Sequence, residues 1–243
     1  EKIDFIKIAL LSSVGITNLW VYKTLRVAVV SSGNELIKSG KKIKDHQVYD
    51  SNKYQIIHFL KKFNISVHDL GILKDDEIKV DKFYKKNQNK FDIIISSGGS
   101  SFSSKDYISS FLSQNTELLF KYVRIQPGRP VIFSKLKFNY YFSLPGNPLA
   151  VFTNLFFLVS LFIDPSRKDN SSITKFYQSG FSENKKSNLT KFYRVKLSKN
   201  ILYTHNSKGS AKLISLSEAD GLAFAPEGND KIKKGEKIRF IEF

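Results

Sequence analysis

One segment, residues 93–107, constrains the possible folds of this chain most. It begins as a β-branched apolar strand, continues through paired glycines and a serine-rich loop, and ends with Asp106 at the start of an expected helix. This order brings backbone N–H groups, hydroxyls and one carboxylate together at the carboxyl end of a buried strand. In open α/β sheets ligands bind at that edge, and a helix N-terminus there favours anions. The segment therefore predicts an α/β sheet with a ligand site beside Asp106.

Strand and helix patterns alternate from residue 26 to residue 165, which is typical of βαβ units on a parallel sheet. Apolar residues between Tyr54 and Leu60, for example, recur at helical spacing. We expect a three-layer, doubly wound and mostly parallel sheet. The expected strands are 26–31, 65–69, 91–96, 121–125, 130–134 and 140–144, and the expected helices are 51–63, 76–86, 105–113 and 148–163.

The chain divides into three parts. Residues 1–25 hold an expected helix and a connecting segment, and they are too few to fold alone. Residues 26–165 form the α/β domain. Residues 166–243 begin with a polar, serine-rich linker that reaches about residue 180, after which short alternating strands and turn signals predict a small all-β domain. Its expected strands are 192–197, 212–216, 221–225 and 236–243.

The formal net charge of +17 comes mostly from lysine, in doublets spread along the chain. A nucleic-acid-binding protein gathers such charge on one face, whereas scattered lysines are typical of solvated surface. We therefore rank a nucleic-acid binder third among the functions considered and expect no nucleic acid as partner. The charge would still steer a polyanionic small molecule toward the protein.

The absence of cysteine excludes disulfides, thiolate metal sites and thiol nucleophiles. The four histidines show no metal-ligand spacing, so a bound metal would be a hard cation held by carboxylates and phosphates. The apolar residues 151–163 fall short of the ~20 that a membrane span needs. We expect a buried helix there, and a cytoplasmic protein with no membrane partner. Because methionine is absent, even at position 1, we expect a fragment or a chain with residues missing.

Polar side chains follow the first two expected strands and precede two expected helices. Glu35 projects from a tight turn after the first strand. Asp50 and Ser51 are both candidates to cap the helix that follows them, so a capping role and a functional role stay open for each. Asp75 and Asp76 precede the next helix, where a single carboxylate suffices as cap. The other is then free to meet a cation.

Two proline–glycine turns flank the last expected strands of the α/β domain. The first reads Gln-Pro-Gly-Arg-Pro at residues 126–130, and the second reads Leu-Pro-Gly-Asn-Pro at residues 144–148. In the second turn Asn147 is a cap candidate and Pro148 takes the first helical position, where proline is favoured. Either turn alone is a weak signal, because such turns are common.

Six motifs follow one another along the chain, at residues 31–36, 48–52, 74–76, 96–107, 126–130 and 144–148. In this order they closely resemble the motifs of the molybdopterin molybdotransferases, the family of bacterial MoeA proteins and the gephyrin E domain. The resemblance reaches the last domain, where Gly209-Ser210 and residues 217–222 are similar to the family's G-S and A-N-G-L motifs. Relatives that share only the sheet domain, such as MogA, lack the two proline–glycine turns followed by a β domain. The resemblance implies a reaction in which adenylylated molybdopterin and molybdate give AMP and molybdenum cofactor, with magnesium assisting.

The resemblance also implies which residues form the site. Glu35, Asp75 and Asp106 match the family's acidic residues and would be catalytic and hold magnesium, which prefers few carboxylates plus phosphate oxygens. The ion would polarise the phosphoryl oxygens, and the N–H groups of the glycine loop would cradle a phosphate or molybdate. The residues implied to bind substrate are Ser32, Gly33, Asp50, Asn52, Gly98, Gly99, Ser101, Arg124, Arg129, Pro145, Asn147, Pro148 and Ser210.

The chain departs from the family pattern at several positions. Asn34 stands where the family has Asp, and Ser103 stands where it has glycine. Lysines around the family's first proline–glycine turn are replaced here by Tyr122, Gln126 and Arg129. Arg and Lys present charge differently, so the anion contacts of this strand are expected to change. The acidic set is intact.

The family's complete protein has a longer first domain, an inserted second domain, and a site between the subunits of a dimer. The chain resembles its C-terminal portion, so we expect a homodimer or an exposed apolar surface near residues 1–20. A MogA-type adenylyltransferase is a further candidate partner. The alternative function is a catalytically weak scaffold or binding module of the gephyrin type, which the missing lysines would suit. Magnesium-dependent binding of molybdate or AMP distinguishes the two.

Overall fold

The computed structural model describes residues 3–98, 106–164, 174–185, 188–204 and 213–243. Five residues singled out by the sequence motifs lie outside the described residues: Gly99, Ser101, Ser103, Gly209 and Ser210. The first half of the predicted linker lies outside them as well.

The larger domain is built on a six-stranded sheet with the order β4-β1-β5-β9-β8-β6. The first four of these strands are mutually parallel, and β8 runs antiparallel to both of its neighbours. Residues 27–30 of β1 are completely buried, as expected for a parallel strand covered on both faces. The strands are β1 (Arg26–Ser32), β4 (Ser66–Leu73), β5 (Ile93–Ser97), β6 (Glu117–Tyr122), β8 (Pro130–Leu136) and β9 (Asn139–Leu144).

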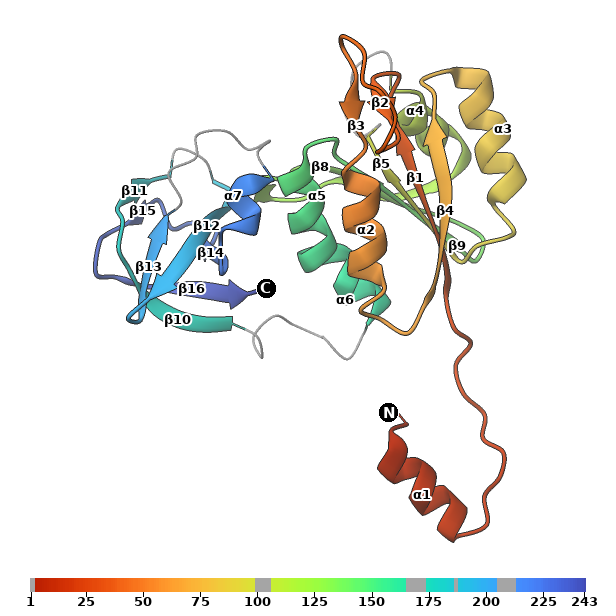
Figure 1. Ribbon diagram of the computed structural model, residues 1–243, viewed down its shortest axis with the longest axis horizontal. Helices are drawn as coiled ribbons and strands as arrows, with labels where there is room; N and C mark the ends of the chain where they lie inside the picture. Colours follow the sequence, from red (N-terminus) through yellow and green to blue (C-terminus); the bar gives the residue numbers. More distant parts are fainter. Residues whose placement is uncertain (1–2, 99–105, 165–173, 186–187, 205–212) are drawn as a thin grey trace.

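Helices cover both faces of this sheet, which confirms the predicted three-layer, mostly parallel architecture (Figure 1). On one face lie α2 (Asn52–Leu60) and a continuous helical segment formed by α5 (Pro148–Asn154), the π-helical η1 (Leu155–Val159) and α6 (Ser160–Ile163). On the other face lie α3 (Glu77–Asn87) and α4 (Tyr107–Asn115). Alternate residues of β1 supply the two cores: Val27 packs toward the first face and Ala28 toward the second.

The second domain is a six-stranded sheet with the order β13-β10-β16-β14-β12-β7, which confirms the predicted β domain. Its core gathers Tyr193, Val195, Ala223 and Phe240. Its strands are β7 (Ile125–Gln126), β10 (Thr174–Ser179), β12 (Thr190–Ser198), β13 (Ile201–Thr204), β14 (Gly221–Ala225) and β16 (Lys237–Glu242). Short pairs complete the chain: β2 (Leu36–Ile37) with β3 (Val48–Tyr49), and β11 (Glu183–Asn184) with β15 (Lys231–Ile232).

Three details of the predicted organisation are wrong. The predicted strand 212–216 is the helical turn α7 (Ile214–Ser217), closed by hydrogen bonds from residues 216 and 217 to the Leu213 carbonyl. The predicted linker contains strand β10, whose pairing with β16 becomes evident only when the sheet is assembled. The predicted strand 121–125 is divided between two sheets, because β6 ends at Tyr122 and β7 pairs with β12 of the second domain.

Strand β7 joins the two domains, since it follows β6 of the first sheet and forms the edge of the second. Rings reinforce this junction: Phe157 stacks on Phe192 with ring centroids 4.4 Å apart, and Phe152 meets Phe243 edge-on at 4.8 Å. Arg124 adds an ion pair of 2.7 Å with Glu227. The β domain is therefore held against η1 and α5, the helical segment that begins at the second proline–glycine turn.

The N-terminal helix α1 (Phe5–Ser13) stands away from both domains (Figure 1). None of its residues is buried, and the side chains of Trp20 and Tyr22 behind it are fully exposed. This confirms the expected exposed apolar surface near residues 1–20. In the part of the chain that the structure describes, no helix is long and apolar enough to cross a membrane.

Candidate functional site

Four loops meet where the parallel strands of the first sheet end. The Gly33 N–H donates to the carbonyl of Leu73 at 3.2 Å, and the Gly98 N–H donates to the carbonyl of Leu144 at 3.0 Å. Gly98 has a φ of +84°, and a Cβ there would collide with the carbonyl oxygen of Ser32. Glycine is therefore needed at this position, because backbones from neighbouring strands approach too closely for a side chain.

Asp75 is held at this edge by the loop that follows β1. Its Oδ1 accepts a hydrogen bond from Ser32 Oγ at 2.9 Å, and its Oδ2 accepts one from the Asn34 N–H at 3.2 Å. In return, Asn34 Oδ1 accepts from the Asp75 N–H at 3.3 Å. The neighbouring Asp76 caps α3 through the N–H of Lys79. One Asp thus serves as cap, as the sequence indicated, and the other reaches the strand ends.

Asp106 caps α4, and its Oδ1 accepts a hydrogen bond from the Ser109 N–H at 2.9 Å. Its Oδ2 is buried without a hydrogen-bond partner among the described residues. Burial raises the pKa of Asp106 to about 6, with the Ser109 hydrogen bond opposing this shift and the charge of Asp75 adding to it. A buried carboxylate oxygen near a second carboxylate is a site that a cation would stabilise.

Glu35 lies beside the same loop but is exposed. A Cβ on Gly33 would come within 2.6 Å of Glu35 Oε1, so the carboxylate occupies the space that this glycine leaves open. In the described part of the chain, no three His, Asp or Glu side chains are grouped closely enough to hold a metal ion. The structure thus brings Asp75 and Asp106 together, and the metal-binding role of Glu35 stays a prediction.

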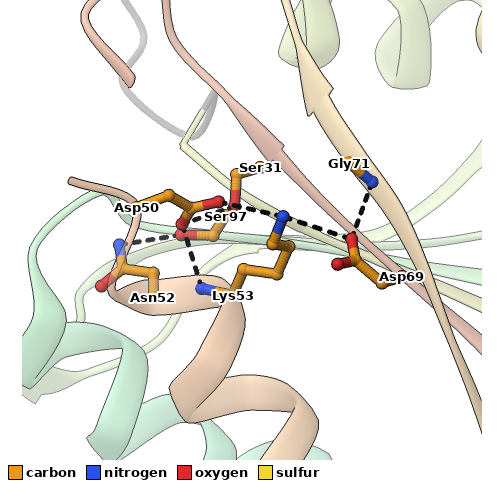
Figure 2. Close-up of polar contacts among 7 residues, drawn as sticks. All are labelled: Ser31, Asp50, Asn52, Lys53, Asp69, Gly71 and Ser97. Carbon is orange, nitrogen blue, oxygen red and sulfur yellow. Dashed lines mark hydrogen bonds and ion pairs between the residues drawn. The ribbon is translucent and has the colours of Figure 1, made fainter. Parts of the chain in front are cut away.

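Asn52 ties two other loops of the site together. Its Nδ2 donates to Ser97 Oγ at the end of β5 at 2.8 Å (Figure 2). It also donates to the carbonyl of Gly146 at 2.8 Å. Asp50, two residues earlier, has 1% of its surface exposed and accepts from Ser31 Oγ at 2.9 Å. Asp50 also accepts from the Lys53 N–H, whereas Ser51 makes no side-chain capping bond. Burial and capping favour a supporting role for Asp50, and its contact with substrate stays a prediction.

The second proline–glycine turn starts α5. Asn147 Oδ1 accepts from the N–H groups of residues 149 and 150, which confirms the predicted cap, and Pro148 occupies the first turn of the helix. Pro145 is buried and Gly146 is exposed. The Gly146 carbonyl, bound to Asn52, fixes this turn relative to the end of β5.

The first proline–glycine turn is anchored on α5. The Gln126–Pro127 peptide is cis. Thr153 Oγ1 donates to the Pro127 carbonyl at 2.8 Å, and Asn154 Nδ2 donates to the Gly128 carbonyl at 3.0 Å. Both proline–glycine turns are therefore organised by a single helix.

The two predicted anion-binding arginines are exposed and have other partners. Arg124 binds Glu227 and also donates to the Asn188 carbonyl at 3.2 Å, both in the second domain. The guanidinium of Arg129 lies over the ring of Tyr122, with its central carbon 5.6 Å from the ring centroid. Their role in substrate binding stays a prediction.

Sequence reasoning missed Lys53, whose ammonium group lies between Asp50 and Asp69. A signal was present, because Lys53 precedes Ile56 and Leu60 at helical spacing on the buried face of α2. Lysine on such a face is unusual and indicates either a snorkelling side chain or a buried ion pair.

The fold and this edge define a class of protein: a doubly wound α/β domain with a candidate ligand site at its carboxyl edge, extended by a β domain. Residues 28–164 match the family model described as a probable molybdopterin binding domain, and residues 178–243 match the MoeA C-terminal region, domain IV. The chain belongs to the MoeA family. This confirms the resemblance on which the sequence analysis relied.

Individual relatives agree with the family models. The molybdopterin molybdenumtransferase of Haemophilus influenzae is 34% identical over 154 residues, covering 63% of this chain and 38% of its own. The enzyme of the same name from Nostoc is 26% identical and covers 99% of this chain and 58% of its own. The crystal structure of a Pyrococcus molybdopterin biosynthesis MoeA protein superposes with a TM-score of 0.81 at 28% identity, covering 100% of this chain and 60% of that one. This chain therefore spans less than two thirds of each relative.

Proposed function

We propose that this chain acts in molybdenum cofactor biosynthesis as a molybdopterin molybdenumtransferase, which inserts molybdate into adenylylated molybdopterin and releases AMP. The names of its relatives support this activity. The observation that carries the proposal is the Asp75–Asp106 pair at the carboxyl edge, with a buried Asp106 oxygen that lacks a partner in the described part of the chain.

Asp75 and Asp106 fit a magnesium ion. Two carboxylates and the phosphate oxygens of a substrate are the ligands that magnesium prefers, and Asp106 retains an uncommitted oxygen. Magnesium bound there supplies a Lewis acid that polarises phosphoryl oxygens. Ser32 and Asn34 orient the carboxylate of Asp75 through their hydrogen bonds. We propose Glu35, exposed beside Gly33, as a further acidic group that faces the substrate.

The remaining site residues would bind and orient the anions. Hydrolysis of the phosphoanhydride adds water across the bond and leaves one phosphate on AMP and the other on the pterin. We propose, from the resemblance alone, that backbone N–H groups of the glycine motif that follows β5 stabilise the charge on these phosphates or on molybdate. We propose that the turn at residues 145–148, held by Asn52, lines the molybdate site.

Release of AMP from adenylylated molybdopterin tests the proposal. The assay compares reactions with and without molybdate and magnesium for the wild-type protein and for Asp106→Asn. Asp81→Asn on α3 is the matched control, because Asp81 pairs with Lys85 on the surface. We expect molybdate-stimulated release that Asp106→Asn abolishes and Asp81→Asn retains. If a full-length protein that contains this chain shows no molybdate-stimulated release of AMP, the proposed transferase activity is refuted.

We propose that the chain forms a homodimer through residues 3–22. The exposed apolar side chains of this segment support the proposal. Sedimentation velocity tests this: Trp20→Ser together with Tyr22→Ser should shift a dimer toward monomer, and a wild-type monomer would contradict it. A MogA-type adenylyltransferase, which would supply the adenylylated substrate, is the further partner we propose.

A catalytically weak scaffold is the second candidate function. Arg124 favours this function, because it lies near the first proline–glycine turn, where the resemblance implies anion-binding lysines. Its guanidinium is already paired with Glu227. A scaffold does not need magnesium-dependent binding of AMP or molybdate, so calorimetry with each ligand, with and without magnesium, separates the two functions.

A further inference from the structure

A buried chain of charges lies beside the proposed site, and the resemblance did not include it. Lys53 has only 2% of its surface exposed, and its Nζ lies 3.6 Å from Asp50 Oδ2 and 3.3 Å from Asp69 Oδ1 (Figure 2). Because an ammonium group costs several kcal/mol to bury without partners, Lys53 requires both carboxylates. The three side chains connect α2, the loop before it and strand β4.

The Asp50 end of this chain reaches one wall of the site. Asp50 binds Ser31 Oγ near the end of β1 and the N–H of Lys53 itself. Asn52 stands between Asp50 and Lys53 in the sequence. Its side-chain amide donates to Ser97 Oγ and to the Gly146 carbonyl. The position of the Asn52 amide therefore depends on how the first turn of α2 is fixed.

The Asp69 end reaches a second wall of the site, the one that β4 and Asp75 form. The register of β4 on β1 shifts between Val29 and Ser31, which face Asp69 and Ile72 respectively, so β4 carries a bulge. Gly71 in this bulge has a φ of +85°, and its N–H donates to Asp69 Oδ1 at 2.8 Å. Bulges re-aim the residues that follow them. The bulge therefore sets where β4 ends and delivers Asp75.

We propose that Lys53 is a positioning residue for the site: it couples the loop that carries Asn52 to the β4 bulge that precedes Asp75. The catalytic consequence rests on the proposed function, whereas the coupling is a property of the chain itself. With the charge removed, Asp50 keeps a buried, unpartnered oxygen and Asp69 loses its cation. The two walls then lose their shared anchor.

The first test needs no substrate. In ¹⁵N-labelled protein, the side-chain amide signal of Asn52 is assigned by its loss in Asn52→Ala. Lys53→Met removes the charge and keeps the apolar stem, and Lys61→Met is the matched control from the exposed end of α2. We expect Lys53→Met to shift or broaden the Asn52 signal and Lys61→Met to leave it in place. An unchanged signal in folded Lys53→Met would overturn the proposal.

Asp69→Asn is the second variant and decides the question if Lys53→Met does not fold. Its side chain is 45% exposed, and the asparagine oxygen can still accept from the Gly71 N–H, so only the charge is lost. It should move the Asn52 signal in the same direction as Lys53→Met, by less. If it leaves that signal unchanged, the coupling does not exist.

Kinetics distinguishes positioning from plain stability. Small misplacements of reacting groups cost one to two orders of magnitude in rate, so we expect Lys53→Met to lower kcat by about tenfold with KM changed by less than about twofold. In the Asn52→Ala background, Lys53→Met should lower kcat by no more than about twofold, because the effects of coupled residues are not additive. Full additivity would contradict the proposal. A wild-type protein without turnover would refute the proposed function, and the amide signals would still decide the role of Lys53.

Discussion

Replacing Asp106 by asparagine should stabilise the protein at neutral pH, and the size of this effect follows from its surroundings. Burial and the charge of Asp75 raise the pKa of Asp106 from 3.8 to about 6. The folded chain therefore binds this proton more tightly than the unfolded chain does. Above about pH 6 the ionised carboxylate lowers the free energy of unfolding. This loss becomes smaller as the pH falls toward 4, because the carboxyl group is then protonated in the folded chain.

A pKa raised by about two units corresponds to ~3 kcal/mol at 1.36 kcal/mol per unit. Because Asp106 lies at the edge of the sheet, where water screens its charge, we expect about half of this. Asparagine can still cap α4 by accepting from the Ser109 N–H, so the substitution removes the charge and keeps the cap.

Urea denaturation of the wild type and Asp106→Asn at pH 4.5, 6.0 and 7.5, without divalent cations, measures the difference. We expect Asp106→Asn to be more stable by ~1.5 kcal/mol at pH 7.5 and by much less at pH 4.5. Asp81→Asn, at a surface ion pair, should change stability by less than ~1 kcal/mol at each pH. A stability gain that does not shrink with falling pH, or no gain at pH 7.5, would refute the reasoning.

Three further predictions concern the loops and the domain junction. Gly98→Ala should cost ~2 kcal/mol in urea denaturation, since its Cβ meets the Ser32 carbonyl, whereas Gly40→Ala, in open space with a similar φ, should cost ~1 kcal/mol. Asn147→Ala should lower the free energy of unfolding by ~1 kcal/mol through loss of the α5 cap, with Asn147→Asp as the control that keeps it. Phe157→Ala should remove the stack on Phe192 and split a single calorimetric unfolding peak into two, which Phe138→Ala at an exposed position should not do.

The α/β domain could be predicted in detail, because its elements are long and periodic. Strand β1 and helix α2 differ from the predicted ranges only at their ends. The second domain was less predictable. Strand β10 is polar and mostly not buried, and its pairing partner is the distant β16. Helix α7 is a four-residue turn whose alternating pattern looks like a strand.

The candidate site shows the same division. The placement of Asp75, Gly98 and Asp106 at the carboxyl edge was predictable because carboxylates, glycines and helix caps have local signatures at strand ends. Arg124 shows the opposite case. Its ion pair with Glu227 was not predictable, because this partner lies about a hundred residues away and only the docked β domain supplies it.

The order of motifs along the chain is enough to establish the family, the sheet domain and the acidic edge, since each motif depends on neighbouring residues. The pairing of Lys53 with Asp50 and Asp69, the bulge that delivers Asp75, and the exchange of β7 into the second sheet depend on contacts between distant segments. Burial and register are properties of assembled sheets. Local sequence therefore specifies the chemical groups of the site, and long-range packing sets the positions of those groups.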